Sequence, residues 1–362
     1  MADLDIIAPR TATKITFSIE PAHNVLCSLI LISSDISGVS EWIQLTASQL
    51  SPERIRNNGI LCGSASSYLQ GVAWPSFEAF LDHLAGQDPY VMRNRELDSL
   101  IDKCANHADE EVSHLPTQEE LLADRGMYLS LMERIYKHKG SAFDRADYEM
   151  THELVNHPVE RKDLMISHLR MMWDEYMAPE WKRSLQMLQE SVASFTSLDF
   201  FGMSTTEIML KVTARDILPD EWGSWLGDIE EVIFIPSAHI GPYLLLIDHN
   251  EKTARIVFGA RVPKGASVSS SSLHRSELLM RLNAMADDTR LHILELMAKE
   301  GELGAKEIIA RLDLSQSSAS RHLRQLSATG YLIERRHEGA KVYRLNRDRI
   351  KNIARSIERL VD

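Results

Sequence analysis

The sequence predicts an α+β fold class, mainly α with small β elements, divided into two domains. Over most of the chain, Leu, Ile and Met recur at intervals of three and four residues, as in amphipathic helices. Short apolar runs of strand length occur near residues 15, 233, 245 and 256. A stretch at 263–272, rich in serine and containing Pro263 and Gly265, has little to bury and predicts a linker.

The linker sets the predicted domain boundaries. Residues 1–262 are expected to form a large, mainly helical domain with a small sheet, which senses a signal or dimerises, and residues 273–362 a second domain. In the first domain we expect a strand at 14–19 and a helix beginning at Pro21. Further helices are expected at 52–69, 76–84, 91–108, 118–138, 161–176 and 180–195, and strands at 231–235, 243–247 and 254–258. Residues 250–252 predict a hairpin turn between the last two strands.

The composition is that of a folded, water-soluble protein, with 44% hydrophobic and 25% charged residues. The longest apolar runs are much shorter than a membrane-spanning helix requires. The first ten residues, MADLDIIAPR, lack the basic segment and apolar core of a signal peptide. These features predict a cytoplasmic protein without a membrane partner.

The sequence predicts neither a metal site nor a catalytic site. Cys27, Cys62 and Cys104 are odd in number and widely spaced, which favours neither disulfides nor a metal knuckle. The run 151–157, THELVNH, places its histidines five residues apart, away from a common helix face, so we expect a surface helix there. No nucleophile elbow or phosphate loop is recognisable, and no cofactor is predicted. The stretch 171–181, rich in Met and Trp, is expected to be core, with a small-molecule pocket as the alternative.

The net charge of −12 is unevenly distributed. Residues 271–362 hold 17 Lys and Arg against 13 Asp and Glu, whereas the rest of the chain holds 23 against 39. The basic charge is therefore concentrated in the second domain, where it would favour a nucleic-acid partner.

The second domain predicts a series of short helices followed by a β-hairpin. We expect helices at 276–285, 305–312, 316–328 and 348–360, and one that starts around the acids Asp287 and Asp288 and ends at Gly301, with strands at 331–336 and 341–345. The helix that ends at Gly301 is expected to direct five apolar side chains inward: Leu291, Ile293, Leu294, Leu296 and Met297. The last helix carries an apolar stripe for dimerisation or for packing against the domain, formed by Ile350, Ile353, Ile357 and Leu360.

The helix at 316–328 has the pattern of a DNA recognition helix. Ser315 is a good N-cap, and Ala319, Leu323 and Leu326 form its apolar face. Short hydroxyl side chains come first on the polar face and let the helix approach the major groove, where longer side chains reach bases or phosphates. The predicted DNA-binding residues here are Ser315, Gln316, Ser317, Ser318, Ser320, Arg321, Arg324 and Gln325.

The basic hairpin after this helix has the pattern of a wing. Arg335, Arg336 and Lys341 surround its tip and are predicted to contact backbone phosphate or the minor groove. Together, the helices and the hairpin predict a winged helix-turn-helix.

This segment resembles the arsenical-repressor (ArsR-type) family of winged-helix regulators. The resemblance rests on the runs 288–294, DTRLHIL, and 314–323, LSQSSASRHL, and continues with Leu326, Gly330, the basic hairpin and 343–345, YRL. It implies a homodimer that represses promoters by binding an inverted repeat, with an effector that weakens DNA binding. It covers about a quarter of the chain and implies nothing for the long N-terminal domain.

The segment departs from the metal-sensing members of that family. Their cysteines stand before the recognition helix, whereas residues 302–308 contain none, and the last helix has no histidine. Because soft and borderline metals require thiolate or imidazole, no metal is expected at either family position.

The leading hypothesis is therefore a sequence-specific, homodimeric repressor of transcription whose N-terminal domain responds to an unidentified effector. Two alternatives are an enzyme fused to a DNA-binding domain and an interaction module that docks a partner. The expected partners are double-stranded operator DNA, a second copy of the chain and a small-molecule effector.

Overall fold

The computed structural model describes residues 13–34, 36–69, 71–106, 115–139, 144–213, 229–249, 252–263, 271–337 and 340–361. The chain divides into two compact units. The helical unit comprises residues 20–34 and 46–180, and the mixed unit comprises residues 1–19, 35–45 and 181–362. Domain boundaries at 262 and 273 stay a prediction, because most of the expected linker lies outside the described residues.

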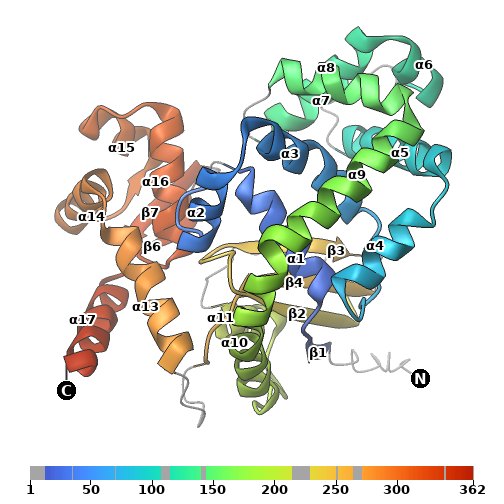
Figure 1. Cartoon of the computed structure of the whole chain (residues 1–362). Helices are drawn as coiled ribbons and strands as arrows, with labels where there is room; N and C mark the ends of the chain where they lie inside the picture. Colours follow the sequence, from blue (N-terminus) through green and yellow to red (C-terminus); the bar gives the residue numbers. More distant parts are fainter. Residues whose placement is uncertain are drawn as a thin grey trace, which may run out of the picture. The chain divides into compact units, whose positions relative to one another are not determined.

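The helical unit consists of amphipathic helices whose starts are marked in the sequence. Ser51, Ser76 and Thr117 each accept a hydrogen bond from a backbone N–H of the turn that follows. Its helices are α1 (Pro21–Ile32), α3 (Pro52–Ser66), α4 (Phe77–Ala85), α5 (Pro89–Asn106), α6 (Gln118–Ala123), α7 (Arg125–Lys139), α8 (Arg145–Asn156), α9 (Pro158–Met172) and the π-helix η1 (Trp173–Met177). Figure 1 shows α5, α7, α8 and α9 gathered in this unit. The chain passes between units within α2 (Glu41–Gln49) and α10 (Ala178–Thr196).

One prediction for this unit is wrong. The expected helix at 118–138 is split, because Asp124 leaves the helical conformation and its Oδ1 accepts hydrogen bonds from the backbone N–H groups of Gly126 and Met127. The helix expected around Thr151 is present with one exposed face, and its inner face buries His152, whose Nε2 lies 3.0 Å from the carbonyl oxygen of Leu121. The stretch rich in Met and Trp packs as predicted for core, with Trp173 and Met177 buried.

The mixed unit contains a four-stranded sheet formed by distant parts of the chain (Figure 1). Its strands are β1 (Lys14–Phe17), β2 (Glu231–Ser237), β3 (Leu244–His249) and β4 (Thr253–Gly259), in the order β1-β2-β4-β3. The β3–β4 pair is antiparallel as the hairpin predicted, although residues 250 and 251 of its turn lie outside the described residues. The parallel pairs β1–β2 and β2–β4 were not predicted. Helices α10 and α11 (Thr205–Thr213) add side chains such as Phe195 and Ile208 to its core.

The C-terminal part of the mixed unit is a winged helix-turn-helix. It consists of α13 (Ser271–Met285), α14 (Asp288–Glu300), β5 (Leu303–Gly304), α15 (Ala305–Leu312), α16 (Gln316–Ala328), β6 (Leu332–His337), β7 (Ala340–Leu345) and α17 (Arg347–Val361). The strands form a small sheet in the order β5-β7-β6. Ile293, Leu294 and Met297 enter its core as predicted, and Leu296 packs against that core, but Leu291 is 41% exposed and its predicted inward position is wrong.

No helix in the described part of the chain is long and apolar enough to cross a membrane.

Candidate nucleic-acid interface

The turn between α15 and α16 positions the recognition helix. Asp313 ends α15 in the left-handed conformation, with φ of 49°, and the backbone N–H of Leu314 donates to Ile309. Ser315 then caps α16, because its Oγ accepts a hydrogen bond from the backbone N–H of Ser318 at 3.1 Å. The cap satisfies one of the amide groups that a helix N-terminus leaves without a partner.

One face of α16 is polar and exposed. Ser318 is half-buried, and the other predicted DNA-binding residues on this face are exposed: Ser315, Gln316, Ser317, Ser320, Arg321 and Arg324. The opposite face buries Ala319, Leu323 and Leu326. The geometry therefore presents hydroxyls near the N-terminus of α16 and two guanidinium groups farther along the same face. Their contact with DNA stays a prediction.

Gln325 does not lie on that exposed face. Its side chain is 2% exposed, and Oε1 accepts hydrogen bonds from Arg290 Nη1 at 2.7 Å and from Ser37 Oγ at 2.9 Å. The predicted position beside Arg324 is wrong because Arg290 and the segment around Ser37 pack against this flank of α16 and supply partners for the amide. We therefore leave Gln325 out of the proposed interface.

Arg290, a residue of the run 288–294, holds two helices of the winged part together, a role that was not predicted. All three of its nitrogens donate: Nε to the carbonyl of Ala284, Nη1 to Gln325, and Nη2 to the carbonyl of Asn283. The residue is 8% exposed and connects the C-terminal end of α13 to α16. A buried arginine needs such partners, so its position at the start of the helix that directs Ile293, Leu294 and Met297 into the core could have indicated a structural role.

The predicted wing is the β6–β7 hairpin. Arg335 pairs with Val342 and Arg336 with Lys341 in the antiparallel register. The Arg335 side chain is exposed, whereas that of Arg336 lies outside the described part of the structure. Lys341 is exposed and also forms an ion pair with Glu334 at 2.5 Å. To contact a DNA phosphate, Lys341 would therefore have to leave Glu334 or bind both groups at once.

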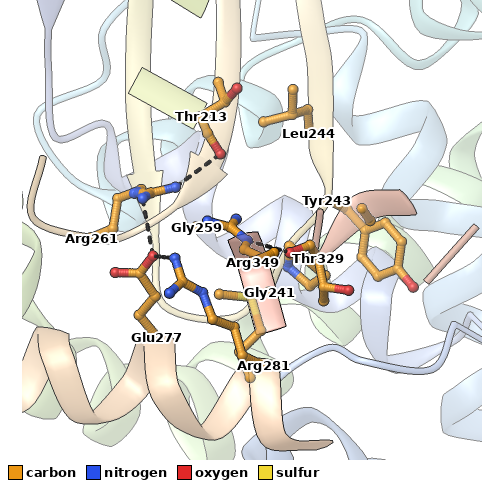
Figure 2. Close-up of a pocket in the computed structure, with 13 residues that line it drawn as sticks. Thr213, Gly241, Tyr243, Leu244, Gly259, Arg261, Glu277, Arg281, Thr329 and Arg349 are labelled. Carbon is orange, nitrogen blue, oxygen red and sulfur yellow. Dashed lines mark hydrogen bonds and ion pairs between the residues drawn. The ribbon is translucent and has the colours of Figure 1, made fainter. Parts of the chain in front are cut away.

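Behind the helix-turn-helix lies a cluster of charged side chains, of which Arg261 is buried and Glu277, Arg281 and Arg349 are half-buried (Figure 2). Glu277 of α13 forms ion pairs with Arg281 and, at 3.0 Å, with Arg261, whose Nη1 donates to the Thr213 carbonyl at 3.0 Å. Arg349 of α17 donates from Nε to the carbonyl of Thr329, just past the end of α16. This cluster joins the strand end after β4 to three helices of the winged part.

The neighbouring arginines determine the pKa of the carboxylate in this cluster. Burial opposes the charge of Glu277, but attraction to Arg261 and Arg281 outweighs burial and holds the pKa of Glu277 below its usual value. Burial and repulsion from the other arginines lower the pKa of Arg349 to about 10. Glu277 therefore stays ionised and screens the guanidinium groups from one another.

The described residues bring together no group of three or more His, Cys, Asp or Glu side chains that could hold a metal ion. The three cysteines are reduced and buried, and burial raises the pKa of the Cys27 thiol to about 12.

Known proteins match the winged part of the chain. The sequence model of a protein family, described as bacterial regulatory protein, arsR family, matches residues 287–334. The arsenic resistance transcriptional regulator ArsR1 of Pseudomonas putida is 42% identical over 76 residues, which are 20% of this chain and 59% of the relative. The transcriptional activator HlyU of Vibrio cholerae is 32% identical over 99 residues, which are 27% of this chain and 91% of the relative. The arsenical resistance operon repressor of Escherichia coli is 40% identical over 62 residues, which are 17% of this chain and 53% of the relative.

The exposed helix face, the wing and these matches define the class of the C-terminal part, which is a winged helix-turn-helix of a transcription regulator. The chain belongs to the arsR family of bacterial regulatory proteins. It spans about three-fifths of the length of ArsR1 and about half of the Escherichia coli repressor. All these matches cover less than a third of the chain, so the helical unit and the sheet have no counterpart in them.

Proposed function

We propose that the protein is a homodimeric, sequence-specific repressor that binds operator DNA through α16 and the wing and is released by an effector. The observation that carries the proposal is the exposed polar face of α16. Ser317 and Arg324 lie seven residues apart, about 10 Å along the helix axis, which suits a major groove about 12 Å wide. Arg321 and Arg324 would contact base edges or phosphates, and the serines would allow close approach.

The wing would supply contacts that do not depend on sequence. Arg335 is exposed on β6, and Lys341 lies opposite the neighbouring position on β7. Cations at a hairpin tip can contact phosphate beside the groove that the recognition helix occupies. In this proposal α16 determines which operator is bound, and the wing adds affinity.

Helix α17 supports the homodimer. Ile353 is buried and Ile350 packs against the winged core, whereas Ile357, one turn further along, is 42% exposed. The predicted stripe thus changes from internal packing to an exposed apolar position along the same helix. A second copy of α17 would cover Ile357 and place two recognition helices on the half-sites of an inverted repeat.

The test is a fluorescence-anisotropy titration of the protein on its own upstream DNA and on a scrambled duplex, at two salt concentrations. We expect tighter binding to the upstream DNA. Arg321→Ala and Arg324→Ala should each weaken this specific binding by ~1–3 kcal/mol. Arg145→Ala is the matched control, because Arg145 is an exposed arginine of α8 in the helical unit and pairs with Glu149. Wild-type affinity in both α16 variants at matched salt would contradict the proposed recognition helix.

The direction of regulation needs a separate measurement, since the relatives include both an operon repressor and a transcriptional activator. Expression of the protein should lower the activity of a promoter–reporter fusion. The Arg321→Ala variant should no longer lower it. Light scattering at increasing protein concentration should give the mass of a dimer. Reporter activity that rises with the protein would assign an activator, and a monomer on DNA would exclude the paired half-sites.

A further inference from the structure

The mixed unit contains a cavity of about 830 Å³ that no sequence motif indicated. One wall is the segment 37–45, a second is formed by the ends of β2 and β4, and a third is α13. Gln325 of the recognition helix closes one side. The volume lies in the range of small-molecule sites, about 300–1,000 Å³, so an organic ligand of cofactor size would fit.

The lining combines apolar surface with cations. The ring of Trp42 stacks on His239 with 4.7 Å between centroids, and Leu45 and Leu279 are 54% and 49% exposed. Exposed apolar side chains that line a cavity favour an apolar occupant, and Trp42 favours a flat one.

The charged and polar lining favours an anionic group on that occupant. The charged side chains are one carboxylate, Glu41, and three arginines, Arg183, Arg275 and Arg290. Arg275 is exposed and forms no hydrogen bond or ion pair with any residue that the structure describes. Ser40 Oγ is buried and, among those same residues, has no hydrogen-bond partner. A carboxylate, sulfonate or phosphate would satisfy both groups.

The cavity wall touches the recognition helix directly. Ser37 Oγ donates to Gln325 Oε1, and Gly38 packs so closely that a Cβ built on it would lie 2.7 Å from Gln325 Nε2. Gly38 also has φ of +87°, a conformation that other residues rarely adopt. A ligand that displaces the 37–40 segment must therefore change the packing of Gln325 and, through it, of Arg290.

We propose that this cavity binds a small organic anion with a flat apolar body, and that its occupation weakens DNA binding through Ser37, Gly38 and Gln325. The proposal rests on the proposed repressor function and assigns its effector site. By linkage, DNA must weaken ligand binding by the same factor as the ligand weakens DNA binding.

The binding test uses anilinonaphthalene sulfonate, a fluorescent aromatic anion, on the full chain without DNA. We expect saturable binding of one molecule per chain, weakened about tenfold or more by Leu279→Glu, which adds an anion to the cavity. Leu291→Glu is the matched control, because Leu291 is also an exposed leucine of the winged part but does not line the cavity. An equal loss of probe binding in both variants, or no loss of probe binding in either, would overturn the proposed site.

A second pair of probes tests the charge. Arg275→Ala should weaken the sulfonate but leave N-phenylnaphthylamine, which has the same ring body without the anion, unchanged. Equal effects on the two probes would reject the role assigned to Arg275. Thermal melting of each variant separates these results from misfolding.

The regulatory part is tested by titrating the sulfonate with and without upstream DNA. We expect about tenfold weaker binding of each ligand in the presence of the other, and a smaller factor in Ser37→Ala, which removes the hydrogen bond to Gln325. Probe binding that is independent of DNA would overturn the coupling while leaving the repressor intact. Failure of the wild type to bind DNA without probe would instead reject the proposed function.

Discussion

The winged part and the helical unit differ in how their polar residues are used. On α16 the serines and arginines of the polar face point outward, as their residue types suggest. In the helical unit, by contrast, Asn58, Arg161 and His168 are buried. His168 Nε2 lies 2.7 Å from Asn58 Oδ1, and Arg161 forms an ion pair with Glu96. Residue type therefore predicts exposure on the outer face of α16, whereas polar side chains that find partners on neighbouring elements are buried. Gln325 and Arg290 show that the same burial occurs within the winged part wherever another segment supplies the partner.

The largest expected effect concerns the cluster behind the helix-turn-helix. Glu277→Ala leaves Arg261, Arg281 and Arg349 facing one another without their carboxylate, and breaking a buried ion pair in this way costs about 3–5 kcal/mol. We expect a correspondingly lower free energy of unfolding in urea. Glu295→Ala, at an exposed position of α14, is the control and should change little. Equal stability of the two variants would show that the winged part does not depend on this cluster.

The buried histidine of the helical unit should make stability depend on pH. Burial, with a contribution from Arg54, lowers the pKa of His168 from 6.5 to about 4. Below pH 6.5 the unfolded chain takes up a proton that the folded chain excludes, so this contribution is complete above pH 6.5 and is lost toward pH 4.

The measurement is urea unfolding at pH values on both sides of 6.5, with His168→Gln as the comparison. Glutamine can still donate to Asn58 but does not titrate in this range. As the pH falls below 6.5, the free energy of unfolding of the wild type should decrease by up to about 1.4 kcal/mol per pH unit more than that of the variant. Parallel pH profiles would mean that His168 is protonated as easily in the folded chain as in the unfolded one.

A smaller effect is expected at the start of the recognition helix. Ser315→Ala removes the side-chain acceptor for the Ser318 amide and should cost about 1 kcal/mol of stability. Ser320→Ala, at an exposed interior position of the same helix, removes no cap and should leave stability unchanged or raise it by a few tenths of a kcal/mol, since alanine favours the helix by about that amount. Thermal melting of the pair measures the cap, and equal melting temperatures would contradict it.

The smallest effect is expected at the wing. Lys341→Ala should weaken binding to all DNA sequences alike and reduce the slope of log affinity against log salt by about 1. Its ion pair with Glu334 makes Glu334→Gln a useful companion, because freeing the lysine should strengthen DNA binding. An unchanged slope in Lys341→Ala would remove this residue from the phosphate contacts.

The sequence predicted the winged part well because its signals are local. Caps, apolar spacing and the hairpin gave α15 and α16 with the bounds that the structure has. The sheet was predicted only in part, since Thr16 and Ile233 pair across more than two hundred residues and no local pattern records that register. The split at Asp124 and the burial of His152 depend on hydrogen bonds that the spacing of apolar residues does not reveal.

The candidate site shows the same limit. Residue type and helix position placed Arg321 and Arg324 on the exposed face, whereas Gln325 turned inward because Arg290 and Ser37 supply its partners from other parts of the chain. The cavity was missed because its walls come from three separated segments.

The inward glutamine of α16 has a consequence for re-engineering operator choice. If a transplanted recognition helix brought a residue other than glutamine to this position, the contacts with Arg290 and Gly38 would be lost. Libraries intended to retarget the regulator should therefore vary Ser317, Ser320, Arg321 and Arg324 and hold Gln325 constant.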